Sequence, residues 1–243
     1  MSAGPSGRLE HDLLGDRRVP SDAYYGIQTL RAVENFAITG LSLRDYPSLV
    51  RSLAMVKKAA VRANARLRLI DPARAAAIEK ACDDVMDLRL LDQFVVDMIQ
   101  GGAGTSTNMN ANEVIANRAL ELLGKARGSY ADLHPNIHVN LSQSTNDAYP
   151  TAVRLGVLLE CVPLAEAIQT LCDALGQKAA EFDDVLKVGR TQLQDAVPMT
   201  LGQEFRAFRV TLAEDIARIE EACRHLREVN LGATAIGTGI NAD

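Results

Sequence analysis

The chain has 243 residues, of which 47% are hydrophobic and 23% are charged, and its net charge is −5. This length and hydrophobic content are enough to bury a sizeable core, so the chain is globular and not disordered. Acidic and basic residues are mixed along the chain, which argues against nucleic acid and an anionic membrane surface as partners. Aromatic residues make up only 4%, and this composition favours long helices packed on helices.

The N-terminal segment and the cysteines are typical of an intracellular protein. The N-terminal segment lacks the apolar core of a secretory signal, and no run of about 18 apolar residues occurs, so a cytoplasmic location is expected. The four cysteines form no CxxC pair, and neither they nor the four histidines have metal-ligand spacing. We therefore expect no metal site and interpret the cysteines as small core residues.

The first half of the chain is expected to contain short helices. Glycines and prolines punctuate residues 1–45, which predicts an extended arm with little regular structure. Composition and end signals then predict a helix at 49–69 and another at 72–86. A third helix is expected from Asn110 to Leu123, because Gly124 is a typical stop.

Two apolar stripes predict long helices in the second half. The first stripe advances in steps of three and four residues from Val153 to Leu175, and Pro163 is expected to kink its helix without ending it. The second runs from Phe205 to Leu226 with an average step close to the heptad value of about 3.5. Such stripes are typical of helix bundles, and both are interpreted as core.

These patterns predict an all-α fold. We expect an N-terminal helical domain, residues 1–143, followed by the first long helices of a central bundle, residues 144–243. Two helices do not cover their own apolar stripes, because a bundle generally needs three or four. The last segment, 232–243, shows no pattern that would close the fold. We therefore expect a truncated bundle, or a core completed by another chain.

Three loops dense in hydroxyl and amide side chains precede predicted helices, at 101–108, 140–147 and 189–195. Glycines let the backbone approach a ligand, and a helix N-terminus offers free N–H groups and the positive end of the helix dipole. Such loops can hold a small dicarboxylate without a cluster of cations. The alternative is ordinary capping and turn formation, which use the same residue types. No Walker-type or dinucleotide-binding glycine motif is present, which argues against nucleotide phosphates.

The same loops carry a family resemblance. They read Gly-Gly-Ala-Gly-Thr-Ser-Thr-Asn (101–108), Ser-Gln-Ser-Thr-Asn-Asp-Ala-Tyr-Pro-Thr (142–151) and Gly-Arg-Thr-Gln-Leu-Gln-Asp (189–195). These segments resemble the first three substrate-site segments of aspartases. The arm from Asp12 to Phe36 also resembles the opening of that family, so the resemblance covers nearly the whole chain. The chain is thus similar to the N-terminal half of an aspartate ammonia-lyase of the aspartase/fumarase superfamily.

Class II fumarate hydratase shares this architecture and is the nearest alternative. The motif typical of fumarases is Thr-Gln-Thr at the positions where this chain has Thr-Ser-Thr (105–107). It is Ser-Ser-Asn-Asp where this chain has Ser-Thr-Asn-Asp (144–147). The fumarase motif also has a tryptophan at the position of Tyr25. Each difference favours aspartase. Fumarases and some aspartases have a histidine at the position of Gln192, so a histidine acid or base is not expected here.

The resemblance implies reversible elimination of ammonia from L-aspartate to give fumarate, through an aci-carboxylate intermediate and without a cofactor. Preorganised donors around the β-carboxylate would stabilise that intermediate. The resemblance assigns substrate binding to Thr105, Ser106, Ser144, Thr145, Asn146, Thr191, Gln192 and Arg31.

Within this set, Thr105 and the run 144–146 would hold the β-carboxylate. Thr191 would contact the ammonium side of the substrate, and Gln192 would position it. Arg31 is a candidate for the α-carboxylate, with a surface or interface ion pair as the alternative.

The family carries its catalytic serine in a Gly-Ser-Ser loop well downstream, and no such motif occurs in this chain. The catalytic residues therefore stay unknown, and we expect this polypeptide to be inactive alone. The resemblance also implies a homotetramer whose active sites combine residues from three subunits. A non-catalytic helical protein that binds a dicarboxylate or a partner chain is the remaining alternative.

Overall fold

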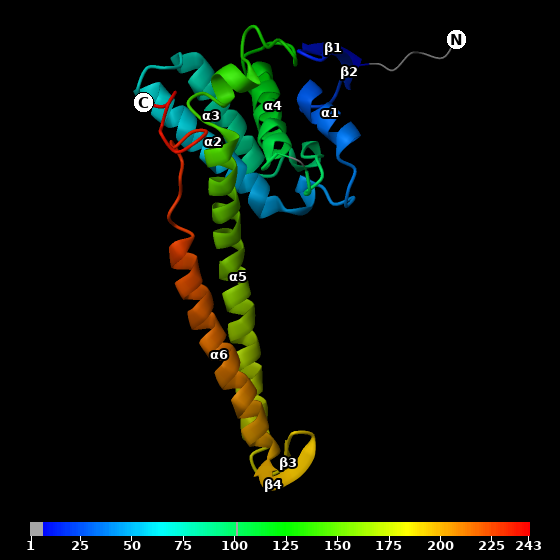
Figure 1. The fold of residues 1–243 in the computed structure, drawn as a ribbon, viewed down its shortest axis with the longest axis vertical. Coiled ribbons are helices and arrows are strands. Elements are labelled where there is room, and N and C mark those ends of the chain that lie inside the picture. The colour runs from blue at the N-terminus through cyan, green and yellow to red at the C-terminus, as the bar shows by residue number, and fades with distance from the viewer. Residues whose placement is uncertain (1–6, 101) are drawn as a thin grey trace, which may run out of the picture. The chain divides into compact units, whose positions relative to one another are not determined.

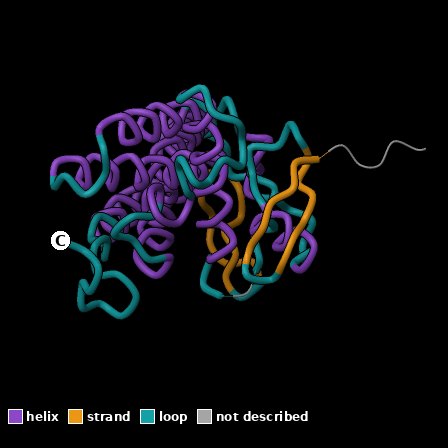
Figure 2. The backbone as a smooth tube through the Cα atoms, turned by 90° about the horizontal axis from the view of Figure 1, so that it is seen from above, coloured by secondary structure: helices purple, strands orange, loops and turns teal. Residues whose placement is uncertain are grey.

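The computed structural model describes residues 7–100 and 102–243, and its elements are mostly helices with two pairs of antiparallel strands (Figures 1 and 2). In chain order they are β1 (Gly7–Asp12), β2 (Gly15–Pro20), α1 (Ile27–Asn35), η1 (Leu43–Asp45), α2 (Pro47–Arg66), α3 (Pro72–Met86), η2 (Leu91–Gln93), α4 (Thr105–Leu122), η3 (Pro135–Val139), α5 (Thr145–Glu181), β3 (Leu186–Thr191), β4 (Gln194–Thr200) and α6 (Leu201–His225). The prediction of a helical fold is confirmed.

The chain divides into two compact units. The first contains the described residues up to Val157 together with Val229–Asp243, and the second is Leu158–Glu228. The predicted domain boundary at residue 143 stays a prediction.

The N-terminal arm is more regular than predicted. Strands β1 and β2 pair as an antiparallel hairpin, and helix α1 follows. The carboxylate of Glu113 in α4 accepts hydrogen bonds from the backbone N–H groups of Gly26, Gln28 and Thr29, at 2.8 to 3.0 Å. A negative charge at this position satisfies the free N–H groups at the start of α1 and complements its dipole. A residue more than eighty positions away in the sequence therefore anchors this helix, which explains why local patterns missed it.

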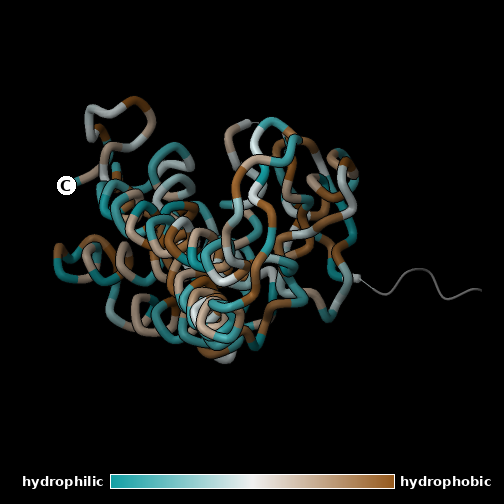
Figure 3. The backbone as a smooth tube through the Cα atoms, turned by 90° about the horizontal axis from the view of Figure 1, so that it is seen from below, coloured by the Kyte–Doolittle hydropathy of each residue, from teal (hydrophilic) through white to brown (hydrophobic). Residues whose placement is uncertain are grey.

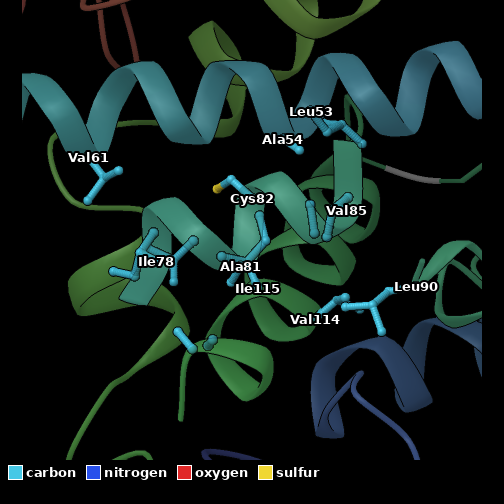
Figure 4. Close-up of a cluster of buried hydrophobic side chains, with 14 of the residues drawn as sticks. Leu53, Ala54, Val61, Ile78, Ala81, Cys82, Val85, Leu90, Val114 and Ile115 are labelled. Atoms are coloured by element: carbon cyan, nitrogen blue, oxygen red, sulfur yellow. The ribbon is translucent and has the colours of Figure 1, made fainter. Parts of the chain in front are cut away.

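The core of the first unit lies between α2, α3 and α4, whose buried side chains meet in Figure 4. Ile78, Ala81 and Cys82 are completely buried there. The predicted helices 49–69 and 72–86 are both present, and the carboxylate of Asp71 caps α3 by accepting from backbone N–H groups of its first turn. Helix α4 begins at Thr105, earlier than the predicted start at Asn110.

In the second unit, the part of α5 from Leu158 onwards lies beside α6, and the β3–β4 hairpin connects the two helices. The sulfur of Cys172 lies 3.8 Å from the carbonyl oxygen of Arg209, and the rings of Phe182 and Phe205 are 5.6 Å apart. Helix α5 continues through Pro163, as predicted.

The apolar stripes of these helices are only partly covered within one chain. Leu164, Leu171 and Phe208 have exposed fractions of 49%, 49% and 52%. Figure 3 shows hydrophobic residues interspersed with hydrophilic ones along the helices. Among the described residues, α5 is the one helix long and apolar enough to cross a membrane. Core helices of soluble proteins share this length and composition. The interpretation of both stripes as core thus requires further protein to cover them.

Candidate active site

The loop before α4 has a left-handed backbone and packs against the start of α5. Gly102, Ala103 and Gly104 have φ angles of 74°, 49° and 86°, while Gly101 lies outside the described residues. A Cβ atom at Gly104 would lie 2.4 Å from Cδ1 of Tyr149, in the second turn of α5. Glycine is therefore required there for two reasons, the φ angle and the contact with the Tyr149 ring.

The second predicted loop caps α5. The hydroxyl of Ser144 accepts a hydrogen bond from Asn146 N at 3.1 Å, and the carboxylate of Asp147 accepts from Ser144 N at 3.0 Å. This is ordinary helix capping, the alternative given above for these loops. It is compatible with ligand binding, because a hydroxyl that accepts a hydrogen bond still has its own proton to donate.

Asn108 connects the two loops. Its Nδ2 donates to Oγ1 of Thr145 at 3.1 Å and to Oδ1 of Asn140 at 3.1 Å. Asn108 is buried in α4, one turn after Thr105. The structure thus brings Thr145 and the first turn of α4 together, as a shared binding site requires.

A buried lysine lies behind these loops, and the sequence patterns did not identify it. Lys57 of α2 has an exposed fraction of 0%. Its Nζ donates to Oδ1 of Asn108 at 2.7 Å, to Oδ1 of Asn140 at 2.8 Å and to Oε1 of Gln143 at 3.0 Å. Burial lowers the pKa of Lys57 to about 7, although the charge of Asp147 opposes this shift.

The signal that could have revealed Lys57 is its spacing. The buried positions Val50, Leu53, Ala54 and Val61 follow the helical period of three and four residues, and Lys57 falls on the same face. A lysine in the middle of an apolar helix face is rarely buried without polar partners. The pattern therefore indicates a buried polar cluster, although it does not locate the partners.

The segment after α6, whose sequence shows no pattern that would close the fold, packs on the start of α5. Oδ2 of Asp147 accepts from Gly232 N at 3.2 Å and from Thr234 N at 2.8 Å. Nδ2 of Asn146 donates to the carbonyl oxygen of Ala235 at 2.7 Å. The fold of this segment depends on backbone groups, so side-chain periodicity could not predict it.

These elements line a cavity of about 580 Å³ that is open to solvent on one side, a size typical of small-molecule sites. Hydroxyl and amide side chains outnumber the apolar side chains among its lining residues. The lining residues are Asn140, Ser142, Gln143, Ser144, Thr145, Thr234, Ala235, Ile236, Thr238, Ile240 and Asn241. None of them is charged. Two of the predicted binding residues, Ser144 and Thr145, thus face a shared cavity with a buried cation behind it.

Other predicted residues lie elsewhere in the first unit. The exposed Thr105 donates from its hydroxyl to the carbonyl oxygen of Gly102 at 2.8 Å, and Ser106 is half-buried; neither lines the cavity. The guanidinium of Arg31 makes two hydrogen bonds of 2.8 Å to the carboxylate of Asp12. This ion pair raises the pKa of Arg31 and lowers that of Asp12. The ion-pair alternative for Arg31 is thus what the structure contains, and its role in binding stays a prediction.

Asn146 is exposed, does not line the cavity and donates from its side chain to the carbonyl oxygen of Ala235. The last two predicted residues, Thr191 and Gln192, belong to the second unit. Thr191 ends β3, and Gln192 begins the tight turn to β4. Gln192 and Leu193 have φ angles of 50° and 62°, the left-handed pair of a two-residue hairpin turn. Both predicted residues are exposed, and their roles in substrate binding stay predictions.

In the described part of the chain, no group of three or more His, Cys, Asp or Glu side chains is arranged to hold a metal ion. The expectation of no metal site stays a prediction.

Comparisons with known proteins agree on one family. A family model described as lyase matches residues 15–243. The chain is 61% identical to an aspartate ammonia-lyase from Pseudomonas aeruginosa, over 100% of this chain and 52% of the relative. It is 57% identical to one from Escherichia coli, over 96% and 49% of the two chains. The chain therefore spans about half the length of the curated relatives it matches.

Solved structures give the same result. The structure of a "fumarate lyase:delta crystallin" from Brucella melitensis bound to cobalt matches with a TM-score of 0.95 and 62% identity, over 98% of this chain and 52% of that one. A class II fumarase from Schistosoma mansoni matches with a TM-score of 0.90 and 37% identity, over 98% and 50%. With the family model covering most of its length, the chain belongs to this lyase family, within the aspartase/fumarase superfamily.

Proposed function

We propose that this chain provides the carboxylate-binding part of an aspartate ammonia-lyase, which eliminates ammonia reversibly from L-aspartate to give fumarate. The observation that carries the proposal is the cavity lined by Ser144 and Thr145, in a chain 57–61% identical to aspartate ammonia-lyases. Most side chains that line the cavity are hydroxyls or amides and none is charged, and Lys57 is buried behind them. Such a wall suits a small dianion that is held by directed hydrogen bonds.

The chemistry explains why hydroxyl and amide donors are useful. A base removes the proton from Cβ, the electron pair moves into the β-carboxylate, and the resulting aci-carboxylate then expels the amine as the C–N bond breaks. The intermediate carries an additional negative charge on the carboxylate oxygens. Donors that already point at these oxygens stabilise the intermediate without reorganising. Ser144 and Thr145 are proposed as two of these donors.

Class II fumarate hydratase is the second candidate, because a fumarase structure also matches nearly the whole chain. Its identity of 37% is lower than the 57–61% of the aspartate ammonia-lyases. This difference favours ammonia over water as the group that is eliminated.

We also propose a homotetramer and a cytoplasmic location for the complete protein. The exposed apolar side chains on α5 and α6 support assembly, because a large apolar surface is generally covered by other protein. Light scattering of the complete protein would test the assembly, and a monomer at micromolar concentration would contradict it.

The test of the function is fumarate formation from L-aspartate, followed by ultraviolet absorbance. The samples are the 243-residue chain alone and the same chain joined to the C-terminal half of the P. aeruginosa relative. Activity of the joined protein with L-aspartate, and not with L-malate, supports the proposal. Activity with L-malate alone would assign a fumarase, and a folded joined protein inert with both substrates would favour a non-catalytic binding role.

The role of Thr145 gives a sharper prediction. Thr145→Val removes the hydroxyl but preserves the shape, so turnover of the joined protein should fall by a factor of hundreds, since one oxyanion donor is worth about 2.7–4 kcal/mol. The matched control is Thr170→Val, also in α5, where the hydroxyl donates to the carbonyl oxygen of Glu166. Near-normal turnover of Thr145→Val would remove this residue from the site.

A further inference from the structure

We propose that Lys57 is a positioning residue of the dicarboxylate cavity: its ammonium group fixes the amide of Asn108, which orients the hydroxyl of Thr145 so that its proton is available to a ligand. This inference deepens the proposed function and rests on it.

The first step is the match between Lys57 and its surroundings. Its ammonium group has three N–H donors and no acceptor, and three amide oxygens accept from Nζ at 2.7, 2.8 and 3.0 Å. A neutral amine has only two N–H groups, so it would leave one of these oxygens without a donor. The oxygens come from Asn108 in α4 and from Asn140 and Gln143 in the loop before α5. The arrangement therefore fits the charged form and ties both segments to α2.

The second step is the orientation of the Asn108 amide. Because an ammonium group cannot accept a hydrogen bond, the oxygen of Asn108 must face Lys57. Its nitrogen then faces away and donates to Oγ1 of Thr145 at 3.1 Å. A hydroxyl that accepts in this way has one proton left, which it can donate to another acceptor. Since Thr145 lines the cavity, a ligand carboxylate there can be that acceptor.

The third step is charge. The three groups that contact Nζ are neutral amides. The titratable groups that face Lys57 are Cys82 of α3 and Asp147 of α5. Burial raises the pKa of the Cys82 thiol to about 12, so it is neutral near pH 7. Asp147 accepts three backbone N–H groups instead of contacting Lys57. The positive charge is thus only partly compensated, which favours an anion in the cavity.

The charge leads to a measurable linkage between ligand and proton. Burial lowers the pKa of Lys57 to about 7, whereas its three amide acceptors favour the charged form, so the group exchanges its proton close to neutral pH. A dianion nearby favours the charged form and raises the pKa. Fumarate binding at pH 8 should therefore take up a fraction of a proton per site. A lysine distant from the bound dianion would not produce this uptake.

All residues in this argument belong to the first unit of the chain, so the 243-residue chain itself is the sample. Fumarate is titrated calorimetrically at pH 8 in two buffers with different heats of ionisation, which gives the affinity and the proton uptake separately. The variant Lys57→Met should bind fumarate about tenfold or more weakly and take up no proton. The matched control is Lys58→Met on the same helix, where Nζ pairs with Asp83 at 2.5 Å; it should behave as the wild type.

A second variant covers the case in which Lys57→Met does not fold. Asn108→Asp keeps an oxygen for Lys57, but it replaces the nitrogen that donates to Thr145 with another oxygen. It should fold and bind fumarate at least about tenfold more weakly.

Wild-type affinity and proton uptake in the folded variants would overturn the role of Lys57 and leave the proposed function standing. A folded wild-type chain that binds no fumarate would instead refute the proposed cavity, and this inference with it.

Discussion

Asp147→Asn should release the segment after α6 from the start of α5. The carboxylate of Asp147 is completely buried. It accepts backbone hydrogen bonds from Ser144 at 3.0 Å, Gly232 at 3.2 Å and Thr234 at 2.8 Å. Oδ1 accepts the hydrogen bond from Ser144, and Oδ2 accepts those from both residues of the C-terminal segment. An asparagine side chain has a single oxygen, so it can accept either from Ser144 or from the C-terminal segment, but not from both.

The magnitude follows from the groups left without an acceptor. If the amide oxygen faces Gly232 and Thr234, the amide nitrogen faces Ser144 N, and two donors oppose each other. One hydrogen bond to a charged group is lost, worth about 1.5–3 kcal/mol, and a buried N–H group stays unsatisfied at a further cost of about 1–3 kcal/mol. The opposite orientation loses two such bonds. We therefore expect a destabilisation of about 3–5 kcal/mol for the first unit.

Urea unfolding and amide hydrogen exchange measure the two consequences separately. The free energy of unfolding should fall, and the backbone amides of Gly232 and Thr234 should lose protection first, because their acceptor is the substituted group. The control is Asp173→Asn, an exposed carboxylate of α5 that accepts from Nε2 of Gln169 at 2.9 Å; it should change stability by less than about 0.5 kcal/mol. Unchanged protection of the two amides in Asp147→Asn would refute this account of the segment.

Two further predictions test the loops. Gly104→Ala should lower the free energy of unfolding of the first unit by about 2–4 kcal/mol in urea, because the added Cβ is strained at the left-handed φ angle and clashes with Tyr149. Adding Tyr149→Ala should remove only the clash. An unchanged stability of Gly104→Ala would contradict the loop geometry. Burial alone would raise the pKa of Asp97, but N–H groups of Ile99 and of residues 39–40 lower it to about 2. This lowered pKa stabilises the fold above about pH 4, and the contribution is lost as pH falls towards 2. The stability of Asp97→Asn should lack this loss between about pH 4 and pH 2 in acid unfolding. An acid-unfolding profile like that of the wild type would contradict the role given to Asp97.

Local signals explain which elements could be predicted from the sequence. Helix α3 begins where Asp71 supplies the cap and Pro72 the first turn, and both are properties of neighbouring residues. The β1–β2 hairpin and α1 lack such signals. The anchor of α1 is Glu113, which lies far along the chain and accepts hydrogen bonds from the backbone at the start of that helix. Contacts between distant residues, and not the choice of residue types in the arm, determine that part of the fold.

In the candidate site, too, local patterns predict some residues, and contacts between distant residues determine the others. The loops at 101–108 and 140–147 were predicted from their composition and from the resemblance, and the structure joins them through Asn108 and Thr145. Lys57 and the segment after α6 were missed, because one is a single residue on an apolar helix face and the other is held through its backbone. Sequence patterns thus indicated the donors that face the cavity, but not the groups behind them that hold the donors in place.

The arrangement of charge in the cavity is consistent with the proposed elimination. Hydroxyl groups fixed from behind form bonds that strengthen as charge accumulates on the carboxylate. The buried ammonium of Lys57 adds a positive potential but reaches the ligand only through Asn108 and Thr145. In the proposed arrangement the buried cation would set the direction of the donors, and the donors would bind the intermediate more strongly than the substrate.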